Sequence, residues 1–126
     1  SNGVTRIKQL AVALFGTPDI CDPPLKDIRY QLLTACAGTL CEAERYGYTR
    51  ALMLIHEFVT ENTSDDKHFS NAADLNSFVN CLSNGSVIAI RDGGIYGPFF
   101  VPGTPLLLAK VELFIGKVKR VLRTSA

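Results

Sequence analysis

The chain has no tryptophan and only one methionine, and its charges almost cancel, with 13 Lys and Arg against 12 Asp and Glu. A net charge of +1 argues against strong, sequence-independent electrostatic binding of nucleic acid by this chain alone, because such binding needs many phosphate contacts, although a local basic patch is compatible with it. The apolar runs are far shorter than the roughly eighteen residues of a membrane helix. A signal peptide begins with a charged segment followed by an apolar one, and this chain does not begin in that way. We therefore expect a cytoplasmic protein with no membrane partner.

Cysteine pairing signals are also missing. The chain has no C-x-x-C motif and no histidine at zinc-ligand spacing from a cysteine. Cys36 and Cys81 fall on faces that the sequence pattern makes apolar, and Cys36 and Cys41 do not share a helical face. We predict buried free thiols, no disulfide framework, no metal and no cofactor. The four cysteines are Cys21, Cys36, Cys41 and Cys81.

What the chain does have is enough apolar sequence for one core. Its 126 residues are 47% hydrophobic, which suits a single domain, here placed at residues 4–123. Residues 1–3 are interpreted as a remnant or a frayed start, and no internal repeat is present. The stretch from Asp27 to Val59 organises the domain: a helical pattern ends at Gly47 and leads into an apolar run. Because that run is apolar on both sides, we predict a strand covered by helices on both faces.

The remaining pattern predicts further helices and strands around this unit. Residues 5–15 form an amphipathic helix, and a third helix, capped at Ser70 or Asn71, ends at Asn84-Gly85. Strands are predicted at residues 87–90, in a hairpin return at 95–96 and at 106–115, followed by a basic helix or tail at 117–123. The predicted class is α/β (α+β): a mixed sheet flanked by helices, in the order α-α-β-α-β-β-β, with a right-handed parallel crossover.

Few residues suggest chemistry. Arg29, Tyr30 and Gln31 fan around the start of the long helix, and a buried Arg or Gln there needs partners. They either anchor the helix to a neighbouring loop or form a substrate-facing patch. His56 is either a ligand or base at the end of a strand or a hydrogen-bonded structural residue. Asp92-Gly93-Gly94 has a strand on each side, so it does not match a phosphate-binding loop, which opens a helix.

Residues 29–58, RYQLLTACAGTLCEAERYGYTRALMLIHEF, resemble the C-terminal portion of an uncharacterised bacterial family grouped with the PD-(D/E)XK, or restriction-endonuclease-like, nucleases. The residues that carry the resemblance are Arg29 to Leu33, Glu42-Ala43 with Arg45, and the strand from Ala51 to Phe58. It covers residues 28–80 and implies the later half of that fold. In that superfamily an aspartate and a Glu/Asp-x-Lys strand hold Mg²⁺ and activate water for phosphodiester cleavage.

The chain departs from that pattern at the metal site. The motif letters occur at Pro18-Asp19 and at Asp65-Asp66-Lys67, but both are in segments predicted as loops, which do not aim carboxylates rigidly at a metal. No catalytic residue is therefore assigned, and the chain by itself is not predicted to be an enzyme. Mg²⁺ is expected only if a longer chain supplies the motif.

Two functions remain open. The first is an incomplete or non-catalytic nuclease-like domain associated with nucleic acid by family analogy. Its polar patch comprises Arg29, Tyr30, Gln31, His56 and Lys110. The second is a small protein-interaction module that forms a homodimer, which would cover the exposed edges of an incomplete sheet. Its partner surface comprises Tyr96, Phe99 and Phe100.

Overall fold

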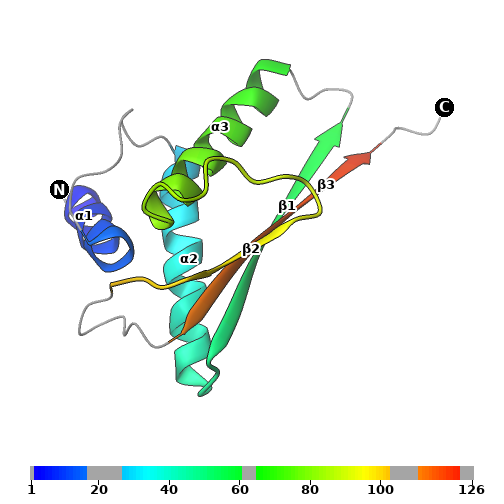
Figure 1. Ribbon diagram of the computed structural model, residues 1–126. Coiled ribbons are helices and arrows are strands. Elements are labelled where there is room, and N and C mark those ends of the chain that lie inside the picture. Colours follow the sequence, from blue (N-terminus) through cyan, green and yellow to red (C-terminus); the bar gives the residue numbers. More distant parts are fainter. Residues whose placement is uncertain (1, 17–26, 61–64, 103–110, 123–126) are drawn as a thin grey trace.

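The computed structural model describes residues 2–16, 27–60, 65–102 and 111–122. Within these ranges the chain forms three helices and a three-stranded sheet (Figure 1). This confirms an α+β domain with a mixed sheet. The elements are α1 (Asn2–Phe15), α2 (Asp27–Arg45), β1 (Arg50–Thr60), α3 (Asp65–Leu82), β2 (Ile95–Phe99) and β3 (Glu112–Leu122).

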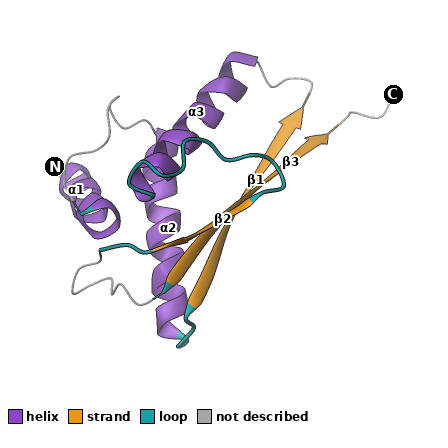
Figure 2. Ribbon diagram, viewed as in Figure 1, coloured by secondary structure: helices purple, strands orange, loops and turns teal. Residues whose placement is uncertain are grey.

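The sheet has the order β1-β3-β2, with β3 in the middle. β1 and β3 run parallel over their full lengths, from Arg50 opposite Glu112 to Thr60 opposite Leu122. β2 is short and antiparallel to β3. The parallel pair therefore joins strands that are separated in sequence by α3 and β2, and the three helices lie on one side of it (Figure 2).

The helices end where the sequence predicts. Gly16, Gly47 and Gly85 all have a positive φ, the backbone conformation that terminates a helix at little cost in glycine. The Gly16 N–H still donates to the Val12 carbonyl, and the Gly85 N–H donates to the Asn80 carbonyl. α1 begins at Asn2, so the helix includes residues 2 and 3.

The core lies between the helices and the inner face of the sheet. From α3 it takes the predicted stripe of Leu75, Phe78, Val79 and Leu82, all buried. β3 contributes Leu113 and Ile115, which are fully buried at the centre of the sheet. The helix α2 supplies the largest share, with Leu32, Leu33, Cys36, Ala37, Leu40 and Ala43.

Several predicted boundaries are wrong. α3 begins at Asp65 rather than at Ser70 or Asn71, so Asp65-Asp66-Lys67 lies at the start of a helix. Residues 87–90 form no strand, and the antiparallel partner of β2 is β3 instead. β3 continues to Leu122, so the segment predicted as a basic helix or tail is a strand as far as that residue. Tertiary pairing with β1 accounts for this extension, because its polar residues carry no strand signal of their own.

The prediction that helices cover both faces of β1 is also wrong. Residues alternate along β1 between partly buried and exposed, with Leu52, Leu54 and Phe58 among the exposed ones. Figure 1 shows the helices on one side of the strands only. One face of the sheet is thus open in the described part of the chain.

Candidate functional site

The open side of the sheet, which we call the outer face, is built by alternation along its three strands. Successive side chains of a strand point to opposite faces, so the even-numbered residues of β1 and β3 share one side. That side is largely apolar and partly exposed. Its large apolar members are Leu52 (49% exposed), Leu54 (52%) and Phe58 (52%) from β1, Phe114, Val118 and Leu122 from β3, and Ile95 (65%) from β2.

Gly116 lies at the centre of the outer face. It is aligned with Leu54 on β1 and with Ile95 on β2. A Cβ at this position would lie 3.2 Å from Leu54 Cδ1 and 3.4 Å from Ile95 Cγ1, so the two side chains close over the glycine. Beside this row the surface forms a shallow hollow of about 370 Å³, lined by Arg50, Ala51, Leu52, Ile95 and Phe114.

Among the described residues of the outer face, the charged groups lie towards its ends. At one end, Arg50 Nε is 3.2 Å from Glu112 Oε2, in an ion pair between β1 and β3. At the other end Arg120 is exposed beside Phe58, its register partner. The rings of His56 and Phe58 stack with their centroids 4.2 Å apart. The outer face therefore has an apolar centre and a polar rim, the usual anatomy of a protein interface.

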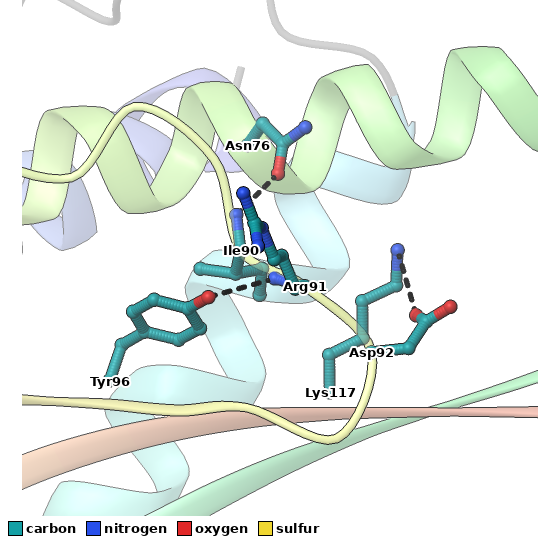
Figure 3. Close-up of polar contacts among 6 residues, drawn as sticks. All are labelled: Asn76, Ile90, Arg91, Asp92, Tyr96 and Lys117. Atoms are coloured by element: carbon teal, nitrogen blue, oxygen red, sulfur yellow. Dashed lines mark hydrogen bonds and ion pairs between the residues drawn. The ribbon is translucent and has the colours of Figure 1, made fainter.

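On the inner side of the sheet, polar contacts hold the segment of residues 83–94, which connects α3 to β2, against α3, β2 and β3 (Figure 3). The Ile90 N–H donates to Asn76 Oδ1 at 3.1 Å, and the Arg91 N–H donates to Tyr96 Oη at 3.0 Å. Lys117 Nζ lies 3.6 Å from Asp92 Oδ1, and the Lys117 side chain is buried. These groups satisfy one another, so we assign them to holding the connection rather than to a ligand.

In the described ranges, the cysteines and acidic residues form no metal centre. Among the residues that the structure describes, no three His, Cys, Asp or Glu side chains gather where they could hold an ion. Cys36 and Cys41 are free, and burial raises the pKa of the Cys36 thiol to about 12. Cys81 is disulfide-bonded, so the prediction that no cysteine is paired is wrong there. Spacing along one helix could not reveal a pairing made by the tertiary fold.

Of the predicted polar patch, the structure describes the side chains of Gln31 and His56, and it does not bring these two together. Gln31 is exposed on α2, within the helical layer, whereas His56 points outward from the opposite side of the sheet. The side chains of Arg29 and Tyr30 and the whole of Lys110 lie outside the described residues, as do Cys21 and Asp19.

The predicted partner surface is divided as well. Phe99 is only 6% exposed and packs in the core, so it is not available to a partner. Tyr96 is half-buried and holds Arg91, as described above. Phe100 alone is exposed, beside a separate hollow of about 320 Å³ that also involves Ser83, Ser86 and Pro98.

The sequence pattern predicts a second buried face for β1, and the structure shows those apolar residues on the exposed outer face instead. The sequence does contain a sign of the outer face, because the run RALMLIHEFV is apolar on both sides of the strand. The sequence pattern of a strand is the same whether its apolar side chains are buried by their own chain or by a partner. The sequence therefore could not show that this face is open.

Comparison with known families places the chain in one of them. A family described as a domain of unknown function, DUF6946, matches residues 1–121. The chain belongs to the DUF6946 family. The DUF6946 match shows no link to the restriction-endonuclease-like nucleases, so that resemblance extends only as far as an uncharacterised family. No curated protein and no solved structure matches the chain. None of the helices in the described parts of this DUF6946 chain is both long and apolar enough to cross a membrane.

Proposed function

We propose that this DUF6946 protein is an interaction module that acts as a homodimer, with the outer faces of two copies packed against each other. The observation that carries the proposal is the apolar outer face, which no described helix or strand covers. Parallel strands normally have both faces covered, because apolar side chains on both sides must be removed from water. A second copy supplies an apolar surface of matching size.

The area of the outer face supports a stable dimer. Its seven large apolar side chains expose on the order of 500 Å² together, at the upper end of what a monomeric protein usually shows in one patch. A standard protein interface takes about 800 Å² from each partner. The apolar centre thus supplies more than half of the required area, and the polar rim at Arg50, Glu112 and Arg120 can supply the remainder.

The experiment is to replace Leu54 with aspartate and measure the oligomeric state by sedimentation velocity over a range of concentrations. Leu54 lies at the centre of the outer face and is 52% exposed, so a polar residue is tolerated in the monomer. In the dimer, the aspartate would be buried without a partner. We expect the dimer Kd to rise by about 100-fold or more.

Ile88 provides the matched control, because it is 79% exposed but lies on the connection before β2, away from the outer face. Ile88→Asp introduces the same charge and should leave the dimer Kd unchanged. A wild-type chain that stays monomeric at its highest soluble concentration would overturn the proposal. An equal loss of dimer in both variants would also overturn it.

A second candidate function is association with single-stranded nucleic acid, favoured by the stacked rings of His56 and Phe58 beside Arg120. Aromatic rings next to a cation are the common means of holding unpaired bases. Fluorescence anisotropy with a labelled oligonucleotide should then show salt-sensitive binding that Arg120→Glu abolishes and Leu54→Asp retains. No binding at low salt would exclude this candidate.

A further inference from the structure

We infer that the two copies pack with their strands antiparallel, around a two-fold axis that passes over Gly116, so that Glu112 of each copy meets the partner's Arg120. This inference rests on the proposed homodimer and adds the arrangement of its two faces. It follows from where the charges of β3 lie on the outer face, because those charges favour one of the two possible two-fold arrangements.

Gly116 lies midway between the two charged residues on the outward-facing side of β3. Glu112 precedes it by four residues (116 − 112) and Arg120 follows it by four residues (120 − 116), so both point to the same side as Gly116. Between them lie Phe114 and Val118, one on either side of the glycine. From Glu112 to Arg120 the outward row of β3 thus reads acidic, apolar, glycine, apolar, basic, with opposite charges at equal distances from Gly116, and Leu122 follows at the end of the strand.

If their strands are aligned, two copies can stack face to face around a two-fold axis in two ways. If the axis runs along the strands, β3 lies parallel to the partner's β3, and each charged residue meets its own copy. Glu112 then faces the partner's Glu112, and Arg120 faces the partner's Arg120. Like charges placed opposite each other disfavour this arrangement.

If the axis runs across the strands, β3 lies antiparallel to the partner's β3. Glu112 then faces the partner's Arg120, and the reciprocal pair forms at the other end, because a two-fold interface makes each contact twice. Phe114 faces the partner's Val118, and Leu54, aligned with Gly116, meets the partner's Leu54. A carboxylate can accept from two arginines, so Glu112 can keep its contact with Arg50 as well.

The middle of this arrangement is well suited to close packing. Facing sheets stack about 10 Å apart, with side chains from both sides interdigitating. Leu54 and Ile95 close over Gly116, which has no side chain to hold the partner away. On β1, Arg50 lies at the height of the partner's Phe58, where an arginine can rest on an aromatic ring.

The test is a charge swap read as the dimer Kd by sedimentation velocity. Arg120→Glu places two acidic residues opposite each other at both ends, so we expect the Kd to rise by about tenfold or more. Adding Glu112→Arg restores the opposite charges between copies, and adding Arg50→Glu restores the ion pair within each copy. The triple variant should bind more tightly than Arg120→Glu alone and regain most of the lost affinity, apart from the share of the contact between Arg50 and the partner's Phe58.

Lys119→Glu is the matched control. Lys119 is the exposed neighbour of Arg120 and has the same charge, but strand alternation turns it to the opposite side. This variant should keep the wild-type Kd, and thermal melts should show that all variants fold. If Leu54→Asp dissociates the dimer but Arg120→Glu acts no differently from Lys119→Glu, the arrangement is wrong and the proposed homodimer stands. If the wild type forms no dimer, both fail.

Discussion

Replacing Gly97 with alanine is expected to lower the free energy of unfolding by about 2–6 kcal/mol. Gly97 has a φ of 140°, which a residue with a side chain adopts only under strain. An added Cβ would lie 2.7 Å from the Leu113 carbonyl oxygen and 2.8 Å from Phe114 Cδ1. Leu113 belongs to the middle strand, whose backbone cannot move aside without disturbing its pairing with β1 and β2.

Gly38 offers the matched control for this substitution. It lies in α2, is exposed, and has no atom within 4 Å of an added Cβ. Because alanine favours the helix over glycine, Gly38→Ala should raise the free energy of unfolding by about 0.5–1 kcal/mol. Urea denaturation followed by circular dichroism measures both variants. A Gly97→Ala protein as stable as the Gly38→Ala protein would contradict the backbone clash.

Cys36 should make the protein less stable at alkaline pH, by about 4 kcal/mol between pH 9 and pH 12. Burial raises the pKa of its thiol from 9.0 to about 12. Between these values the unfolded chain loses the thiol proton while the folded chain keeps it, so each pH unit favours unfolding by about 1.4 kcal/mol. The protonated Cys36 thiol therefore adds its full share to the free energy of unfolding below pH 9, and this share is lost as the pH rises towards the pKa of the folded state.

Comparison with Cys36→Ala isolates this effect, because other groups that titrate in the alkaline range are the same in both proteins. The variant is less stable at pH 8, where it has lost buried packing, but its free energy of unfolding should fall less steeply above pH 9. Cys41, exposed on the same helix, gives the second control. Cys41→Ala retains Cys36, so its free energy of unfolding should fall above pH 9 as steeply as that of the wild type. Equal alkaline slopes in the wild type and Cys36→Ala would contradict the burial argument.

The helices were the most predictable part of this fold, because their signals are local. The apolar stripe of α3 and the glycines that end α1 and α2 depend on residues within one or two turns. The start of α3 was less predictable. Its first turns contain Asp65, Asp66 and Lys67, which resemble a surface loop in sequence.

The strands were predicted less well, because their pairing is not local. β3 pairs with β1 across about sixty positions of sequence, and its second half contains Lys117, Lys119 and Arg120, which have low strand propensity. Residues 87–90 show the opposite error. Val87, Ile88 and Ile90 favour a strand, yet Asn76 accepts the Ile90 N–H that a neighbouring strand would otherwise engage.

For the candidate site, a homodimer was one of two functions that the sequence left open, and the partner surface predicted for it is not the outer face. The aromatic residues around Pro98 were predicted to form a partner surface because they lie in a segment rich in turn residues. One of them, Phe99, is in the core. The outer face is made by residues from three strands that come together only in the folded sheet. Leu54, Gly116 and Ile95 have no relation in sequence that would place them in one row.

The parallel pairing of β1 with β3 also sets the order in which the chain can fold during synthesis. Arg50 and its partner Glu112 are 62 residues apart. A ribosome that adds about 5–20 residues each second needs roughly 3–12 s to cover that interval. During this time β1 has been synthesised but its partner strand β3 has not. The apolar side chains of β1 are then available to other nascent chains. The protein should therefore depend on chaperones during translation more than its small size suggests.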